Sequence, residues 1–265
     1  MNPPSLSQPL STARPDWRRA FGGVWRLTYG RYLAPSSLGI LAGLLGVIAL
    51  LALSGMHRGN AEHFAEWSVH FYLAFVVPVL AFLTAAGLIQ DDMKPATVDY
   101  VLTRPVRRPM FVLFRFLAHT ACVQAQCLLG LGVLVVVGVF RQVPGLAATA
   151  PSLLLAQFLA VTAFSALGFA FGVLTNRYLV LGIFYAGIIE MGVGNIPTQL
   201  NRLSMTRHVR TIASNIINLN GKGAGQLESL PASIGALLLF ALILLAVAAT
   251  LFSIKESVGA KPKDA

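Results

Sequence analysis

The chain has 265 residues, of which 56% are hydrophobic and only 11% are charged. Soluble domains carry a charge on roughly a quarter of their residues, so this composition excludes an ordinary soluble domain and predicts an all-α integral membrane protein with several spans. The formal net charge is +10, but the basic residues flank apolar runs. We therefore interpret the charge as a membrane-topology signal and expect no nucleic-acid partner.

The first 34 residues divide into two parts. Residues 1–15 are rich in proline and serine, which predicts a disordered N-terminal tail. In residues 16–34, apolar side chains from Trp17 to Tyr32 recur at helical spacing, and the arginines lie opposite or beside this stripe. The pattern predicts an amphipathic helix that lies in the membrane interface.

Residues 35–254 contain six apolar segments and are predicted to form a six-span domain. The predicted spans are residues 35–56, 67–89, 110–140, 151–175, 178–194 and 232–254, of which the fifth is the shortest. A charged segment at 90–109 separates the second span from the third, and a long polar loop at 195–231 separates the fifth from the sixth. Residues 255–265 form a short tail.

Six spans put both termini on the same side of the membrane. That side would also carry the segment at 90–109 and would hold 14 of the 20 lysines and arginines, against 6 on the other side. Lysine and arginine accumulate on the cytoplasmic side of membrane proteins. We therefore predict a multi-pass protein with both termini and segment 90–109 in the cytoplasm, and with loop 195–231 outside.

The segment at 90–109 carries seven charged residues between two apolar spans. Pro95 suits the first turn of a short helix, and Arg104 would lie in its last turn, before Pro105 ends it. Two interpretations are open. The segment is either a docking helix for a soluble partner or a solvated loop that obeys the positive-inside rule.

The order of parts in this region resembles the permease subunit of type-2 ABC transporters, most of which are exporters. The resemblance rests on a span, the acid pair Asp91-Asp92, the run P-A-T-V-D-Y-V-L, the element R-P-V-R-R and a long third span in which Arg115 lies near the start. Ala96 stands where the family more often has glycine. The resemblance extends to the interfacial helix and the six-span layout, and so to most of residues 16–254.

The resemblance implies that segment 90–109 is a cytoplasmic coupling helix that binds a separate ATPase subunit. The residues expected to contact this subunit are Asp91, Asp92, Lys94, Thr97, Asp99, Arg104, Arg107 and Arg108. ATP and Mg²⁺ would then be bound by the partner ATPase, with no cofactor on this chain. Other expected partners are a second permease in a homodimer or heterodimer, membrane lipid, and periplasmic or accessory proteins, in a bacterial cytoplasmic (inner) membrane.

The sequence offers no chemistry of its own. Residues 221–225, G-K-G-A-G, lack the spacing of a phosphate-binding loop. No zinc-protease motif, nucleophile elbow or cysteine–histidine cluster is present in the sequence. We therefore expect a permease without catalytic residues or a metal site.

Glu190 is the only carboxylate inside a predicted span, in its outer part. A charge at the centre of a span costs roughly 2.5–3.5 kcal/mol, so this side chain is expected to face the bundle, a cavity or a partner. It is either a substrate or gating contact or a structural anchor for the outer loop. After it, apolar residues of 205–216 form a helical stripe that Ser204 can cap. The candidate pathway or outer-gate residues are Glu190, Asn195, Arg207 and His208.

Two other classes of function remain open at this point. One is a proton-coupled secondary transporter in which Glu190 takes up the proton, although a single intramembrane acid gives it little support. The other is a membrane scaffold that transports nothing. The sequence does not identify a substrate.

Overall fold

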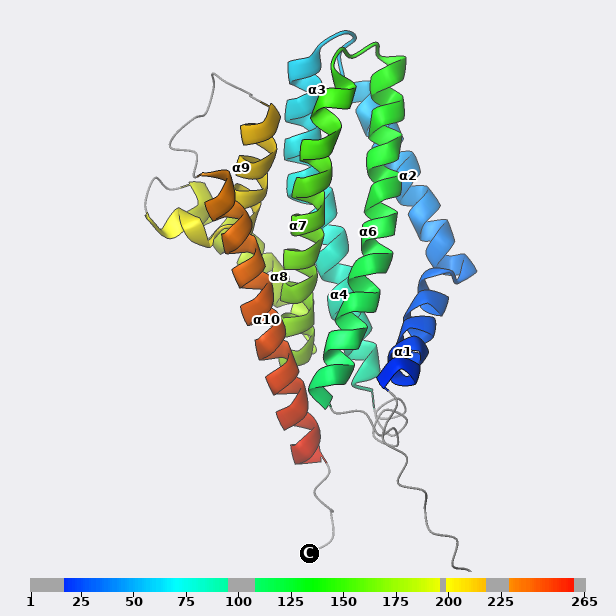
Figure 1. The fold of residues 1–265 in the computed structure, drawn as a ribbon, viewed down its shortest axis with the longest axis vertical. Helices are drawn as coiled ribbons and strands as arrows, with labels where there is room; N and C mark the ends of the chain where they lie inside the picture. Colours follow the sequence, from blue (N-terminus) through cyan, green and yellow to red (C-terminus); the bar gives the residue numbers. More distant parts are fainter. Residues whose placement is uncertain (1–16, 95–107, 196–198, 218–228, 260–265) are drawn as a thin grey trace, which may run out of the picture.

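The computed structural model describes residues 17–94, 108–195, 199–217 and 229–259, and all the regular elements in these ranges are helical. The all-α prediction is confirmed for this part of the chain. In chain order (Figure 1) the elements are α1 (Trp17–Tyr32), α2 (Pro35–Gly55), α3 (Ala61–Trp67), η1 (Ser68–Val76), α4 (Val77–Asp92), α6 (Arg108–Phe140), α7 (Leu146–Leu174), α8 (Tyr178–Tyr185), η2 (Ala186–Gly192), η3 (Val193–Asn195), η4 (Gln199–Leu203), α9 (Met205–Ile217) and α10 (Leu230–Gly259). The predicted tail at 1–15 lies outside the described residues, as does Asp16.

Five helices within these ranges are long and apolar enough to cross a membrane. They are Pro35–Gly55, Ala61–Asp92, Pro109–Phe140, Leu146–Leu174 and Leu230–Lys255. Where a fifth span was predicted, the structure has a shorter apolar helix, Tyr178–Gly192. At about 1.5 Å per residue this helix is about 22 Å long, which is less than the roughly 30 Å of a hydrocarbon core. By length alone, five of the six predicted spans are therefore present.

The second long helix differs from its prediction at both ends. It begins at Ala61, inside the predicted loop, because the Asn60 side chain accepts a hydrogen bond from the backbone N–H of His63 (2.9 Å) and so caps the helix. It ends at Asp92, so the acid pair belongs to its last turn. Pro78 lies in the first turn of α4, and the π-helical segment η1 ends two residues before this proline. Such wider turns occur where a helix adjusts to a missing backbone N–H.

The helices form an elongated bundle with two distinct ends (Figure 1). We call the end where α4 finishes, α6 begins and α10 finishes the base end, and the opposite end, with the α2–α3 and α6–α7 turns, the far end. The two far-end turns meet, since the N–H of Gly59 donates to the carbonyl of Arg141 (2.9 Å). α1 lies at the base end against α6, with Val24 and Thr28 buried.

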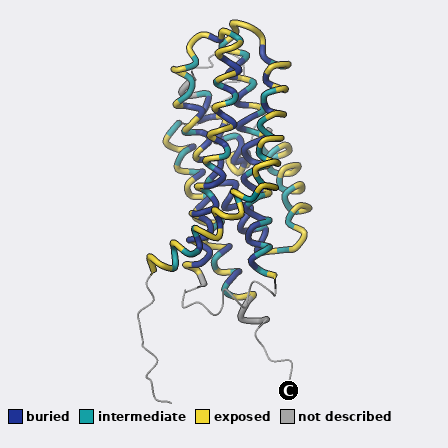
Figure 2. Tube along the Cα trace, turned by 90° about the vertical axis from the view of Figure 1, so that its right-hand side faces the viewer, coloured by how far each residue is buried: buried dark blue, intermediate teal, exposed yellow. Residues whose placement is uncertain are grey.

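Helix α7 is the centre of the bundle. It packs against α4, α10, α9 and α6, and its buried residues run along nearly its whole length. Buried residues are concentrated in the interior of the bundle (Figure 2). α4 approaches it closely at two glycines. A Cβ on Gly168 would lie 2.5 Å from the Phe82 carbonyl oxygen, and one on Gly172 would overlap Ile89. These two glycines lie four residues apart, a spacing that lets two helices approach each other closely.

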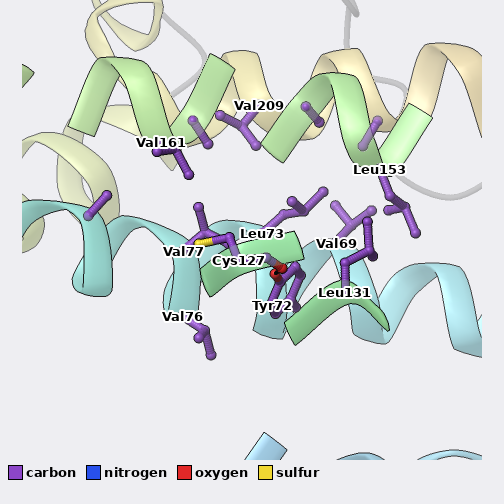
Figure 3. Packing of buried hydrophobic residues seen from close by; sticks show 14 of the residues in the cluster. Val69, Tyr72, Leu73, Val76, Val77, Cys127, Leu131, Leu153, Val161 and Val209 are labelled. Carbon is purple, nitrogen blue, oxygen red and sulfur yellow. Dashed lines mark hydrogen bonds between the residues drawn. The ribbon is translucent and has the colours of Figure 1, made fainter. Parts of the chain in front are cut away.

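The segment after α7 changes direction within the bundle (Figure 1). α8 and η2 rise from the base end, η3 and η4 follow near mid-height, and α9 continues alongside α7 to the far end. In the core, Val209 of α9 lies near Val161 of α7 (Figure 3). The Tyr72 hydroxyl lies 2.5 Å from the Cys127 carbonyl and 2.9 Å from the Gln157 side-chain oxygen, which ties η1 to α6 and α7.

Candidate functional site

A buried ion pair joins α4 and α6 at the base end. The Arg115 guanidinium binds Asp92 through two hydrogen bonds, Nε to Oδ2 at 2.7 Å and Nη2 to Oδ1 at 2.8 Å. Both side chains are less than 10% exposed. The third contact of this guanidinium, Nη1 to the Thr28 hydroxyl at 2.8 Å, reaches α1. One planar cation therefore connects three helices in a two-pronged geometry that lysine cannot reproduce.

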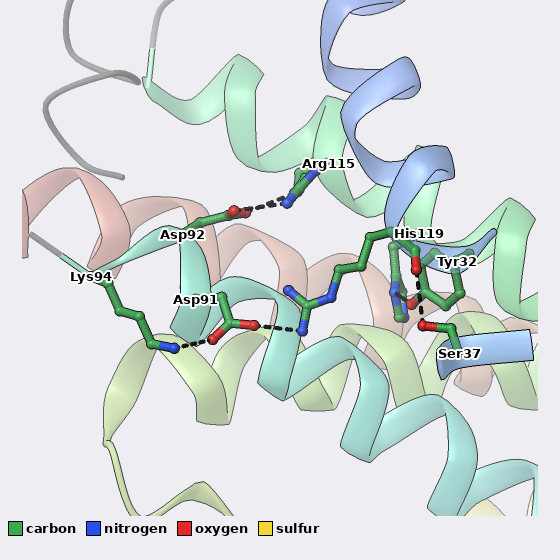
Figure 4. Close-up of polar contacts among 8 residues, drawn as sticks. Tyr32, Ser37, Asp91, Asp92, Lys94, Arg115 and His119 are labelled. Atoms are coloured by element: carbon green, nitrogen blue, oxygen red, sulfur yellow. Dashed lines mark hydrogen bonds and ion pairs between the residues drawn. The ribbon is translucent and has the colours of Figure 1, made fainter. Parts of the chain in front are cut away.

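A second, more exposed layer lies beside this pair (Figure 4). Asp91 accepts from Arg31 of α1 at 2.5 Å and from Lys94 at 2.6 Å. The two layers together form what we call the base cluster, which consists of Thr28, Arg31, Asp91, Asp92, Lys94 and Arg115. Near it, the Tyr32 hydroxyl lies 2.6 Å from Nδ1 of the buried His119. These contacts hold α1 against the point where the chain leaves the bundle for residues 95–107.

The end of α7 is also tied to its neighbours at the base. The last carbonyls of a helix have no partner within it, and here side chains from two other helices supply donors. Gln90 donates to Thr175 (2.9 Å) and to Gly172, and Lys255 of α10 donates to Val173 (2.6 Å) and Leu174 (2.8 Å). The helices at this end therefore form one connected unit.

The structure places only some of the residues predicted to contact an ATPase. Asp91, Asp92 and Lys94 are described; Thr97, Asp99, Arg104 and Arg107 lie outside the described residues, as does the side chain of Arg108, although Arg108 begins α6. Asp92 is turned inward to Arg115, whereas Lys94 is exposed.

Arg115 lies about two turns inside α6, which begins at Arg108. Its side chain is buried because it balances the charge of Asp92, which is 5% exposed. The positions of Asp92 and Arg115 in the sequence are a signal for this pair. In a helical hairpin, an acid in the last turn of one helix and a base two turns into the next lie at similar depth.

Glu190 lies in the π-helical segment η2 and anchors the start of α9. Its Oε1 accepts from the Tyr185 hydroxyl (2.7 Å) and the Met205 N–H (3.1 Å). Its Oε2 accepts from the Ser204 hydroxyl (2.6 Å) and the Thr206 N–H (3.1 Å). A carboxylate at a helix N-terminus is stabilised by the unpaired amides and by the helix dipole. The geometry therefore favours the anchor interpretation over the contact interpretation.

Ser204 completes this junction. Its hydroxyl accepts from the N–H of Arg207 at 3.1 Å, so the capping role predicted from the sequence is present. The first three amides of α9 thus all have acceptors, two on Glu190 and one on Ser204. This satisfies most of the donors that would otherwise be left unpaired at a helix start inside the bundle.

The other predicted gate residues occupy different environments. His208 is buried, its Nε2 lies 2.9 Å from the Arg202 carbonyl, and its ring lies near Phe240 of α10. It therefore packs in the bundle. Arg207 is partly exposed and lines a groove, whereas Asn195 ends η3 and its side chain lies outside the described part of the chain.

This groove runs between α3–η1–α4 on one side and α8–η2–α9 on the other, with a volume of about 830 Å³. Its wall toward the base end is apolar and includes Phe75, Val79 and Ile183. Toward the far end the lining becomes charged, as described below. Among the described residues, no group of histidines, cysteines and carboxylates could hold a metal ion.

The comparisons with known proteins agree with this arrangement. The family described as "ABC-2 family transporter protein" matches residues 12–257, which include all the helices described above except the last two residues of α10. A search of curated proteins gave no match. With its long apolar helices and base cluster, the chain is a multi-pass membrane protein and belongs to the ABC-2 family of transporter proteins.

Proposed function

We propose that this chain is the membrane-spanning permease subunit of an ATP-driven ABC exporter in a bacterial cytoplasmic membrane. Proteins of this family are membrane transport components and associate in general with an ABC ATPase subunit. A separate ATPase would bind ATP and Mg²⁺, and this chain would supply the path for a substrate that is not identified. A second permease, identical or related, would complete the path.

We further propose six crossings, with α8–η2 and α9 together forming the fifth. The two pieces are about 22 and 20 Å long at about 1.5 Å per residue, and together they exceed a hydrocarbon core of roughly 30 Å. A broken crossing is tolerated where its free backbone groups are satisfied inside the protein, and Glu190 and Ser204 do this for α9. Both termini then lie in the cytoplasm, in agreement with the distribution of basic residues.

The observation that carries the proposal is the base cluster. Residues 95–107 connect the end of α4 to the start of α6, and the buried pair of Asp92 and Arg115 lies at that junction. A force applied to these residues by an ATPase would act on α4 and α6 together, and on α1 through Thr28. Closure of two ATPase subunits would then rock each helix bundle as a unit and open a path between the two permeases.

The proton-coupled alternative receives less support from Glu190. Each of its oxygens already accepts two hydrogen bonds, and two of the four donors are backbone amides, which cannot accept a proton in return. Protonation would therefore break contacts that hold α9. We assign Glu190 an anchoring role in the broken crossing.

Copurification tests this function. The tagged chain, expressed with the genes that neighbour it, is expected to copurify with a P-loop ATPase, and the triple change Arg104→Glu, Arg107→Glu and Arg108→Glu is expected to abolish this. A matched double change, Arg26→Glu with Arg177→Glu, alters exposed cations outside segment 90–109 and should leave the complex intact. The proposal fails if no ATPase copurifies, or if the triple change alters neither binding nor ATP hydrolysis.

A further inference from the structure

The far-end part of the groove carries opposite charges on its two walls. Glu62 and Glu66 are exposed on α3, one helical turn apart, and both line the groove. Arg207 and Arg210 line it from α9, also about one turn apart. Glu190 also lines the groove on the arginine side, but its two oxygens already accept four hydrogen bonds. A ligand that bridges the two walls would therefore meet the carboxylates of α3 on one side and the guanidinium groups of α9 on the other.

Toward the base end, the lining of the same groove is apolar. Phe75 and Val79 on one wall and Ile183 and Leu179 on the other are exposed although they are large and hydrophobic. The groove therefore changes along its length from charged at the far end to apolar near mid-height. A volume of about 830 Å³ lies within the range of roughly 300–1,000 Å³ that holds a sizeable organic ligand.

We propose that this groove binds a zwitterionic phospholipid, with its phosphate at Arg207 and Arg210, its ammonium group at Glu62 and Glu66, and part of an acyl chain along the apolar wall. Arginine pairs with phosphate oxygens through parallel hydrogen bonds. Carboxylates suit an ammonium group, so a headgroup that carries both signs has a partner on each of the two charged walls. A purely anionic lipid would satisfy only one wall and would face repulsion from the other.

The orientation of this ligand agrees with the proposed topology. The charged part of the groove lies toward the outer surface and the apolar part lies toward the membrane centre, as a phospholipid of the outer leaflet requires. The inference names the cargo class of the proposed permease, and only the transport of that cargo rests on the proposed function. Binding itself is a property of this chain and is testable without an ATPase.

Photocrosslinking tests the binding. The full chain, purified in detergent, is mixed with phosphatidylethanolamine that has a photoactivatable acyl chain, and the labelled peptides are identified by mass spectrometry. The label is expected on η1–α4 and on α8–η2. Unlabelled phosphatidylethanolamine should compete about tenfold better than phosphatidic acid, which lacks the ammonium group. Phosphoethanolamine without acyl chains should not compete at the same concentrations.

Paired variants distinguish the contributions of the two charged walls to binding. Arg207→Gln with Arg210→Gln should weaken the binding of both lipids by about tenfold. Glu62→Gln with Glu66→Gln should weaken the binding of phosphatidylethanolamine only. Ala74→Trp, in the lining of the groove, should remove the crosslink by filling the space of the acyl chain. Arg58→Gln changes an exposed far-end cation that does not line the groove and should have no effect. Thermal unfolding of each variant verifies that it is folded.

Three results would overturn the inference. The first is a label spread over all exposed apolar helices, which indicates bulk lipid only. The second is that phosphatidylethanolamine and phosphatidic acid compete equally well, and that neither pair of substitutions changes this competition. The third is a high-yield disulfide between two copies carrying Val79→Cys, because a second copy of the chain would then cover the groove. If instead binding is found but no ATPase copurifies, the lipid site stands and the exporter proposal fails.

Discussion

Two carboxylates of the same helix bundle, the buried Asp92 and the partly buried Glu190, are stabilised in opposite ways. Asp92 faces a full positive charge, the Arg115 guanidinium, in a two-pronged contact. Glu190 is held by four donors, two hydroxyls and two backbone amides at the start of α9. The first arrangement links three separate helices through one charge, whereas the second repairs a break within one proposed crossing. Loss of Asp92 or its partner should therefore affect the whole base end, and loss of Glu190 should affect α9.

The largest effect is expected from breaking the buried pair at Arg115. Arg115→Met leaves Asp92 charged and unpaired among apolar side chains, which costs about 3–5 kcal/mol in comparable cases. The thermal unfolding midpoint of the purified protein, followed by fluorescence, should fall strongly. Combining Arg115→Met with Asp92→Leu removes the unpaired charge and should recover most of the loss. Arg26→Met, at an exposed arginine, is the control. Equal destabilisation in the single and double variants would show that the unpaired charge is not the cause.

A smaller and more local effect is expected at Glu190. Glu190→Leu leaves the amides of Met205 and Thr206 without an acceptor, and an unsatisfied buried group costs about 1–3 kcal/mol. Hydrogen exchange at the start of α9 should accelerate by roughly 10- to 100-fold, since each 1.4 kcal/mol corresponds to a factor of ten. Exchange in α1 and in the first turns of α6 should not change.

Two further variants serve as controls for the exchange rate measured in Glu190→Leu. Glu190→Gln keeps one acceptor oxygen and should lie between the wild type and Glu190→Leu. Glu66→Leu removes an exposed acid of α3 and should leave α9 unchanged. If exchange increases along the whole bundle in Glu190→Leu, Glu190 does more than anchor one helix, and the contrast with Asp92 disappears.

The same two sites show how far the sequence predicts the structure. Hydropathy located the long helices because a span of about 20 apolar residues is a local signal. The Ser204 cap was also predictable, since it depends on residues three apart. Asp92 and Arg115 are 23 residues apart and Thr28 is farther still, so their meeting depends on how α1, α4 and α6 pack. No local pattern encodes that packing.

For Glu190, the sequence indicated the environment of the side chain but not the residues that bind it. That its side chain would face the bundle, a cavity or a partner was anticipated from its position in an apolar segment, but the residues that bind it were not. They lie 14 to 16 residues later, apart from Tyr185, across a turn whose geometry the sequence does not reveal. The short fifth segment was the available clue. A segment too short to cross a membrane, followed by a capped amphipathic helix, is compatible with one crossing made of two pieces.

The contact between Arg115 and α1 is expected to matter less than the ion pair itself. Thr28→Val keeps the shape of the side chain but removes the acceptor for Nη1, and a hydrogen bond to a charged group contributes about 1.5–3 kcal/mol. Because Asp92 still pairs with Arg115, the loss should appear mainly as faster exchange in α1. Thr28→Ser retains the hydroxyl and should behave as the wild type. Unchanged exchange in Thr28→Val would mean that apolar packing alone holds α1.

The smallest effect is expected at Asp91, which precedes Asp92 in the chain but lies in the exposed layer of the base cluster. Its partners Arg31 and Lys94 are largely solvent-accessible, and exposed ion pairs contribute about 0–1 kcal/mol and weaken with salt. Asp91→Asn should therefore leave the unfolding midpoint nearly unchanged, in contrast to a break of the neighbouring pair. If Asp91 serves the ATPase interface, the same variant should lower ATP hydrolysis in the assembled transporter without loss of stability. A large loss of stability would instead place Asp91 with Asp92 as a structural residue, and an unchanged hydrolysis rate would remove it from the interface.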